Sequence, residues 1–248
     1  MRVNINLLAF LMSALTLLSQ CTGTQKQEQA AEEPESAAMP QEEWVYLFNG
    51  ENLDNWELLG GDADFSVEDG MIVGTTEEDL PNCFLTTRDN YSDFVLEVDF
   101  KIDPNINSGV QIRSTTWEKD TTTSYVNGSL EEGTRDWEAG RVVGYQIEID
   151  PSDRAWTGGF YEEGGRGWLQ PLTENDSAQQ AFKPGEWNQM RIRAEGNHFE
   201  SWINGVKAVD ATDDTWNSGF IGLQLHGAWR ENQIGQKVYF KDIRLRKL

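Results

Sequence analysis

The sequence is short of positive charge. It has 20 Lys and Arg residues against 42 Asp and Glu residues, which gives a formal net charge of −22. A chain this acidic repels polyanions and anionic lipid surfaces, so nucleic acid and a bare membrane surface are not expected partners. Solubility explains the acidity, and a calcium-rich acidic surface is compatible with it but not required.

The sequence also lacks a hydrophobic run long enough for a transmembrane helix. Its apolar run at 7–18 follows Arg2 and leads into the segment L-L-S-Q-C. A short cationic start followed by about a dozen apolar residues is typical of a signal peptide, which we predict for residues 1–20. Cys21 then resembles the lipidated cysteine of bacterial lipoproteins, although Gln20 departs from the small residue preferred there. The alternative is an ordinary signal peptide with an incidental cysteine.

Cysteine is scarce, since only Cys21 and Cys83 occur. If the first carries lipid, no partner remains for an intramolecular disulfide, although export would permit one. The hydrophobic core must then hold the fold together. Cys83 is expected to be a small buried residue rather than a nucleophile.

Aromatic residues are missing from residues 22–42, which are rich in Gln, Glu, Ala and Ser. Such a segment cannot bury enough apolar surface to fold. We therefore predict that residues 21–42 are a lipidated, flexible tether. It would hold an exported domain at the bacterial cell envelope, in the periplasm or at the cell surface, with the lipid as its only membrane contact.

Helical periodicity is absent after residue 42, where short alternating segments recur between Gly, Asn and Asp turns. Residues 94–102 place five apolar side chains on one face and Glu97, Asp99 and Lys101 on the other. Asn204-Gly205 is a strong hairpin signal. We predict a single all-β domain over residues 43–248, a sandwich or jelly roll of antiparallel sheets.

Three of the predicted strands have polar faces unlike ordinary solvated ones. Period-two alternation groups the following residues, strand by strand: Gln111 and Arg113; Gln146, Glu148 and Asp150; Gln224 and His226. Lys and Thr, which are common on solvated strand faces, are missing from these positions. Amides, carboxylates, a guanidinium and an imidazole replace them, and such groups bind sugar hydroxyls and transfer protons.

The Gly-rich segment 156–169 adds three aromatic rings, Trp156, Tyr161 and Trp168. Glycines between them let the backbone approach a ligand closely. Aromatic rings near carboxylates suit the apolar faces of pyranose rings. Each ring taken singly is equally well explained as core, but the three together favour contact with a ligand.

Each polar candidate also has a structural explanation. Glu148 alone fits a solvated strand carboxylate, and Arg113 fits an ion-pair partner of Asp150. His226 fits a hydrogen-bonded histidine at a strand end, and His198, in a predicted turn, is expected to be solvated.

Several motifs, in order from about residue 44 to residue 248, resemble the 3-keto-disaccharide hydrolase family, formerly a domain of unknown function. They are L-F-N-G-E-N-L-D-N-W, F-S-V-E-D-G-M-I-V-G, N-S-G-V-Q-I-R-S, G-Y-Q-I-E-I-D-P, R-A-W-T-G-G-F-Y-E-E-G-G-R-G-W-L, P-G-E-W-N-Q-M-R-I-R-A-E-G, W-I-N-G-V and G-F-I-G-L-Q-L-H-G. The resemblance implies a concanavalin A-like β-sandwich and action on glycosides whose sugar has a ketone at carbon 3. It also agrees with a lipoprotein. A common family form has Glu two residues before the Gln of the acidic strand, where this chain has Gly144 and places its acid at Glu148.

The resemblance implies an enzyme that removes the proton from carbon 2, after which the group on carbon 1 departs and water can add. Glu148 or His226 is the candidate base, with Asp150 beside them as the third catalytic candidate. Arg113, or a divalent metal held by Glu148, Asp150 and His226, would stabilise the enolate, and the metal is not specified. The candidate substrate-binding residues are Gln111, Arg113, Gln146, Trp156, Tyr161, Trp168 and Gln224.

Two other functions remain open at this stage. One is a non-catalytic carbohydrate-binding module of a surface glycan-processing system, because sandwiches of this kind host both roles. The other is a structural accessory protein of a surface complex.

Overall fold

The computed structural model describes residues 43–248. The predicted signal peptide, Cys21 and the tether lie outside the described residues. Within residues 43–248, no helix combines the length and apolar character needed to cross a membrane.

The described chain forms two sheets. The eight-stranded sheet contains β1 (Val45–Tyr46), β3 (Asp64–Glu68), β4 (Met71–Thr75), β6 (Phe94–Ile102), β13 (Asn188–Glu195), β14 (His198–Ile203), β15 (Val206–Thr212) and β17 (Lys237–Lys247). Its order is β15-β14-β13-β6-β17-β4-β3, and β1 pairs with β17.

The nine-stranded sheet contains β2 (Trp56–Leu59), β5 (Cys83–Thr87), β7 (Ser108–Thr116), β8 (Thr121–Val126), β9 (Glu132–Trp137), β10 (Val142–Ile149), β11 (Phe160–Glu163), β12 (Gly167–Gln170) and β16 (Phe220–Leu225). Its order is β2-β5-β16-β7-β10-β11-β12-β8-β9. All its pairs are antiparallel except β12 with β8. Two short helices, α1 (Asp176–Gln179) and η1 (Glu231–Gln233), complete the fold.

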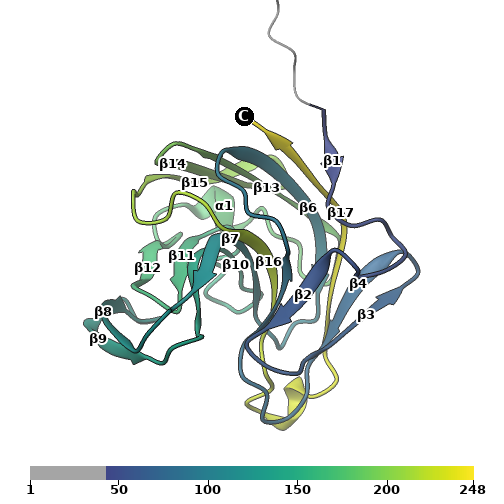
Figure 1. The fold of residues 1–248 in the computed structure, drawn as a ribbon, viewed down its shortest axis with the longest axis horizontal. Coiled ribbons are helices and arrows are strands. Elements are labelled where there is room, and N and C mark those ends of the chain that lie inside the picture. The colour runs from purple at the N-terminus through teal and green to yellow at the C-terminus, as the bar shows by residue number, and fades with distance from the viewer. Residues whose placement is uncertain (1–42) are drawn as a thin grey trace, which may run out of the picture. The chain divides into compact units, whose positions relative to one another are not determined.

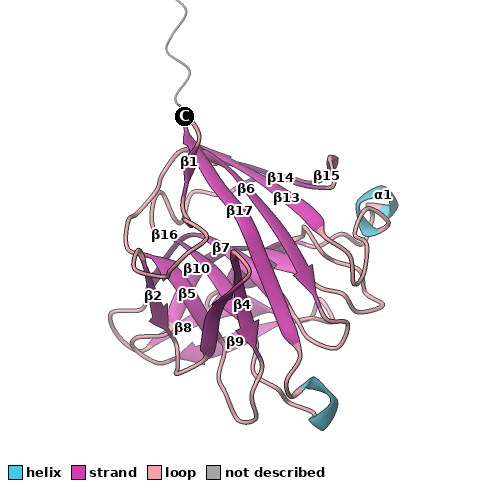
Figure 2. Cartoon of the chain, turned by 90° about the vertical axis from the view of Figure 1, so that its right-hand side faces the viewer, coloured by secondary structure: helices cyan, strands magenta, loops and turns pink. Residues whose placement is uncertain are grey.

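The two sheets pack against each other as a sandwich (Figures 1 and 2). Alternate residues of each sheet face the shared core, and these include Phe94, Leu96 and Val98 of β6 and Tyr145 and Ile147 of β10. Burial of these side chains is the main favourable contribution to folding. The predicted all-β sandwich is therefore confirmed.

Turn residues end the strands where the sequence predicts. Asn204 and Gly205 both have positive φ, of 50° and 81°, and they join β14 to β15. Positive φ at both central residues matches the twist of a tight hairpin. Cys83 is buried in the core, and this burial raises the pKa of its thiol. It therefore behaves as a small apolar residue, as expected.

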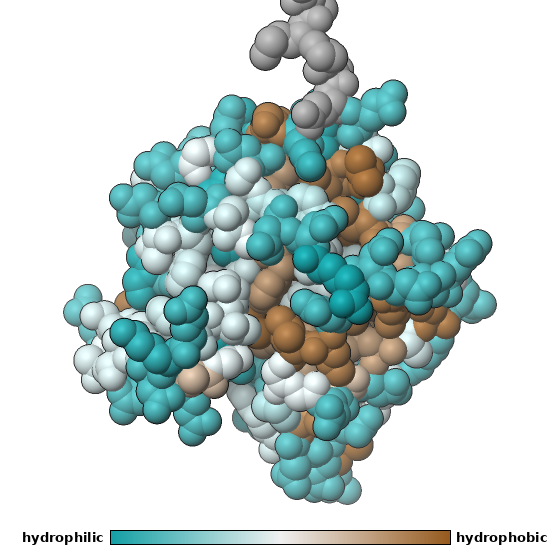
Figure 3. Space-filling view, viewed as in Figure 1, coloured by the Kyte–Doolittle hydropathy of each residue, from teal (hydrophilic) through white to brown (hydrophobic). Residues whose placement is uncertain are grey.

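Strand β10 differs from an ordinary surface strand because both of its faces are buried. One face contributes to the sandwich core, and loops from other parts of the chain cover the polar face. The surface is indented between the β8–β9 hairpin and the segment that contains η1 (Figure 3). This arrangement places the polar residues of β10 at the floor of a cavity.

Candidate functional site

A cavity of about 660 Å³ lies over the polar face of β10. Its volume falls within the range of about 300–1,000 Å³ that is typical of ligand pockets. Among the sequence-predicted residues, the ones that line it are Gln146, Glu148, Asp150, Tyr161, Trp168, Gln224 and His226. Period-two alternation and the Gly-rich segment thus identified part of the cavity lining, including the polar face of β10.

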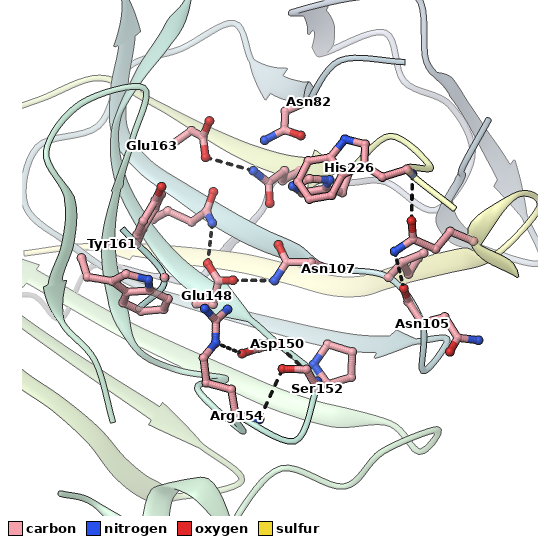
Figure 4. A pocket seen from close by; sticks show the side chains of 18 of the residues that line it. Asn82, Asn105, Asn107, Glu148, Asp150, Ser152, Arg154, Tyr161, Glu163 and His226 are labelled. Atoms are coloured by element: carbon pink, nitrogen blue, oxygen red, sulfur yellow. Dashed lines mark hydrogen bonds and ion pairs between the residues drawn. The ribbon is translucent and has the colours of Figure 1, made fainter. Parts of the chain in front are cut away.

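Glu148 occupies the floor of the cavity and is only 4% exposed (Figure 4). Asn107 Nδ2 donates to one carboxylate oxygen at 2.5 Å, and Gln146 Nε2 donates to the other at 2.8 Å. Burial disfavours the charged carboxylate and raises the pKa of Glu148 to about 7, although both amide donors oppose the change. A carboxyl group with this pKa can accept or donate a proton near neutral pH.

A chain of amides orients this carboxylate. Ser114 Oγ donates to Gln111 Oε1 at 2.8 Å, and Gln111 Nε2 donates to Gln146 Oε1. Because its oxygen is occupied, Gln146 presents its nitrogen to Glu148. A Cβ at Gly109 would lie 2.5 Å from the Gln146 amide carbon, so a glycine is needed beside it. Gln111 thus supports the site from behind and does not line the cavity.

Asp150 follows β10 and is neutralised by a cation. Arg154 Nε donates to its Oδ2 at 2.7 Å. The guanidinium of Arg154 also lies over the Trp168 ring, with its central carbon 5.3 Å from the ring centroid. Asp150 therefore holds Arg154 beside the cavity, and its charge is committed to that ion pair.

A second buried carboxylate, Glu163 on β11, lines the cavity although the sequence analysis did not single it out. It is paired with Arg141 and accepts a hydrogen bond from Gln224 Nε2 at 3.3 Å. Burial raises the pKa of Glu163, and the nearby Arg141 opposes that effect. Glu163 thus has a cation partner, whereas Glu148 has amide partners only.

His226 lies directly after β16 at another wall of the cavity. Burial lowers the pKa of His226 to about 4, so the imidazole is neutral at pH 7. It packs edge-on against the Trp229 indole, with ring centroids 4.2 Å apart. A neutral imidazole can donate one ring N–H and accept at the other nitrogen.

Two of the three rings in the Gly-rich segment reach the cavity. Tyr161 and Trp168 line it in an edge-to-face arrangement with centroids 5.1 Å apart, and the Tyr161 hydroxyl lies 3.2 Å from that of Tyr125. The prediction that Trp156 contacts a ligand is wrong, because this residue is buried in the core between Arg154 and Trp168. Its indole packs behind the cavity wall rather than at the ligand surface.

The prediction that Arg113 faces the site is wrong. Its φ of 46° marks a bulge in β7, where the pairing with β16 also changes register. A bulge breaks period-two alternation and redirects the side chain. The buried guanidinium donates to the Ser92 and Gly196 carbonyls, each at 2.6 Å, and to Asp93 at 2.8 Å. The suggested ion pair with Asp150 is wrong for the same reason.

The suggested ligands of a divalent metal, Glu148, Asp150 and His226, do not bring their ligand atoms together. Among the described residues, the group of three ligand-type side chains within 4.8 Å of one another is instead His198, Glu200 and Asp210. Lys207 donates to Glu200 at 2.5 Å and to Asp210 at 2.7 Å, so an ammonium group already neutralises this cluster. His198 is solvated in part, as expected, and lies 2.7 Å from Asp210.

Residues that the sequence analysis missed also line the cavity, and the most informative are Asn82, Asn107, Arg141, Glu163 and Trp229. Two of them stand inside segments already noted for their resemblance to a family, Asn107 in N-S-G-V-Q-I-R-S and Glu163 in F-Y-E-E-G-G. The others lie in turns or at strand ends, where no periodicity signals a direction.

A family model described as a 3-keto-alpha-glucoside-1,2-lyase-like domain matches residues 43–246. The chain belongs to this family, which gives it a carbohydrate-related function. No curated protein sequence matches the chain.

Solved structures share the fold at low sequence identity. A candidate glycosyl hydrolase from Parabacteroides distasonis is 21% identical with a TM-score of 0.52, over 83% of this chain and 94% of that one. A Bacillus subtilis protein of unknown function with a galectin-like fold is 13% identical with a TM-score of 0.54, over 83% and 94% of the two chains. These likenesses support the sandwich architecture.

Proposed function

We propose that this protein cleaves glycosides whose sugar has a ketone at carbon 3, with Glu148 as the base that removes the proton from carbon 2. The observation that carries the proposal is the state of Glu148, a buried carboxyl group with amide partners only and a pKa of about 7. The family to which the chain belongs supports the class of substrate.

The proposed reaction is an elimination. The ketone acidifies the carbon 2 proton, Glu148 takes that proton, and the electrons of the C–H bond form an enolate with the ketone. The enolate then forms a double bond between carbons 1 and 2 as the bond from carbon 1 to the leaving oxygen breaks. The proton that Glu148 has taken then passes to the leaving oxygen, directly or through water, so the leaving group departs as an alcohol and Glu148 is ionised again. Addition of water across the new double bond would make the net reaction a hydrolysis.

Two cavity groups suit the negative charge that develops on the ketone oxygen. The neutral His226 ring can donate an N–H, and the Arg141 guanidinium, which is paired with Glu163, has further N–H donors. Because burial keeps the imidazole of His226 neutral at pH 7, the ring would donate a hydrogen bond to the ketone oxygen rather than supply a positive charge. In this proposal both residues stabilise charge, and Glu148 moves the proton.

The test is incubation of the full chain with matched panels of 3-keto disaccharides and ordinary disaccharides, with products followed by NMR. We expect cleavage of the keto sugars only, and a rate constant about 10²-fold or more lower for Glu148→Gln. Because the base must be ionised, kcat/KM should fall about tenfold per pH unit below pH 7. Glycan binding without turnover of any keto sugar would instead favour a carbohydrate-binding module.

We also propose that the protein is exported and anchored to the cell envelope through lipid on Cys21, a residue outside the described part of the chain. The order of Arg2, the apolar run and L-L-S-Q-C supports this. Cys21→Ser should abolish incorporation of labelled fatty acid and release the protein from the membrane fraction. Normal cleavage and unchanged membrane association of that variant would contradict the anchor.

A further inference from the structure

Trp229 is the most exposed of the large hydrophobic residues in the described chain, with 75% of its surface accessible. It nevertheless lines the cavity and meets His226 edge to face. A single exposed indole is not unusual in itself, but one at the rim of a cavity offers a flat apolar face to a ligand. The proposed reaction gives Glu148 and His226 roles but leaves this ring without one.

The loop that carries Trp229 holds it in place through backbone contacts. A Cβ at Gly227 would lie 1.8 Å from the Leu80 carbonyl oxygen, so the loop is pressed against a neighbouring segment. The Ala228 N–H donates to the Glu77 carbonyl at 3.0 Å. The ring is therefore presented by a fixed backbone, and a ligand would not have to order the loop.

Gln233 ties this loop to the residues around Glu148. Its Oε1 accepts from the backbone N–H of Trp229 at 2.8 Å, and its Nε2 donates to the Asn105 carbonyl at 2.8 Å. Asn105 stands two residues before Asn107, whose amide orients the Glu148 carboxylate. The exposed ring and the proposed base are thus held in one connected network.

The sheet order places Glu148 between two aromatic groups. Tyr161 and Trp168 belong to β11 and β12 on one side of β10, and Trp229 follows β16 on the other side. Figure 4 shows Glu148 between Tyr161 and His226, the residue that Trp229 contacts. A carboxylate flanked by aromatic rings suits a substrate with a ring on either side of the bond to be broken.

The two aromatic groups differ in exposure, which assigns their roles. Trp168 is 6% exposed, so it suits the sugar whose chemistry requires exclusion of water. The open Trp229 suits a group that must depart into solvent. Resting on the proposed function, we propose that Trp229 forms a subsite for the leaving group of the glycoside, and that this group has a ring with a flat apolar face. Such a ring is either a second pyranose or an aromatic aglycone.

The test compares kcat/KM for three substrates: a 3-keto-glucosyl disaccharide, a phenyl 3-keto-glucoside and methyl 3-keto-glucoside. We expect Trp229→Ala to lower the ratio of ring-bearing to methyl substrate about tenfold, as the loss of one aromatic contact predicts. Trp229→Phe should retain most of the ratio. The disaccharide and phenyl arms show which kind of ring the subsite prefers.

Trp202→Ala is the matched control, because Trp202 lies on β14 of the other sheet, beneath Arg191 and Lys207. It should leave the ratio unchanged. An equal ratio in the unchanged protein and in Trp229→Ala would overturn the subsite, as would an equal loss in Trp202→Ala.

A binding measurement separates this proposal from the catalytic one. Calorimetry with an ordinary disaccharide, phenyl glucoside and methyl glucoside requires no turnover. If no keto sugar is cleaved but Trp229→Ala abolishes a preference for the ring-bearing ligands, the subsite stands and the catalytic proposal fails. If the unchanged protein shows no such preference in either assay, the subsite is refuted.

Discussion

Strands β6 and β10 have nearly the same alternation of apolar and acidic residues, but their buried glutamates have different partners. Glu97 in L-E-V-D and Glu148 in I-E-I-D both alternate with core residues, and both are almost fully buried. Glu97 accepts from Arg191 at 3.1 Å and from Arg244 Nε at 2.9 Å. Glu148 accepts only from two neutral amides.

The difference lies in what covers each strand face. The outer face of β6 is open at its rim, so the arginines beside Glu97 remain between 37% and 43% exposed and reach water. Loops surround the cavity face of β10, and no guanidinium group hydrogen-bonds to Glu148 there, although the nearby charge of Arg154 acts to lower the pKa of Glu148. Cations stabilise a carboxylate, whereas burial with amides alone leaves it close to its neutral form near pH 7. The first arrangement supports stability, and the second keeps a proton acceptor available.

The largest expected effect concerns stability at Glu148. Its folded pKa of about 7 lies above the ordinary 4.5, so its contribution to stability is fully present below about pH 4.5 and is lost as the pH rises through 7. Glu148→Gln removes that ionisation. We expect the variant to be more stable than the unchanged protein by about 3 kcal/mol at pH 8, and by little at pH 4.5.

Urea unfolding at the two pH values measures this difference. A variant that is less stable than the unchanged protein at pH 8 would show that the carboxylate of Glu148 is well solvated or paired. The contrast with Glu97 would then disappear.

A smaller and opposite effect is expected at Glu97. Glu97→Gln leaves Arg191 and Arg244 without their carboxylate, but both guanidinium groups can turn toward water. We expect a loss of about 1–2 kcal/mol in the free energy of unfolding, with turnover unchanged because this face is remote from the cavity. Chemical denaturation and a rate assay measure the two quantities, and a large loss of turnover would contradict the division between the faces.

The smallest effect tests the amides themselves. Asn107→Leu removes a donor to the charged form of Glu148, so the pKa of Glu148 should rise by about one pH unit. The midpoint of the pH–rate profile should move upward by the same amount. Gln189→Leu is the matched control, since Gln189 donates to Asp99 on the other sheet at 3.4 Å. Equal midpoints for both variants would mean that Asn107 does not tune the base.

Part of the site was predictable because alternation along one strand is a local property. Gln146, Glu148 and Asp150 lie together at the cavity because successive side chains of a strand point to opposite faces. Arg113 follows the same pattern in sequence and fails, because the bulge in β7 depends on pairing with β16, a strand about a hundred residues away.

Partners on other strands were not predictable in this way. Arg141 meets Glu163 only after β10 and β11 have paired, whereas Arg154 lies just four residues after Asp150. Asn107 lies in a segment without periodicity, so nothing in its own spacing aims it at Glu148. These contacts leave Glu148 as the one of the three carboxylates, Glu148, Asp150 and Glu163, that has no hydrogen-bonded cation among the described residues.

The sequence by itself determined the strands, the hairpin turns and the residue types on each strand face, because these depend on side-chain alternation and on the backbone preferences of a few neighbours. Only the tertiary structure decided that the polar face of β10 is covered while that of β6 reaches solvent. Coverage sets the cost of a buried charge, and contacts between distant segments set whether a cation offsets it. Two glutamates in nearly the same pattern therefore differ in role: Glu97 is an ion-pair partner in one sheet, and Glu148 is the candidate base in the other.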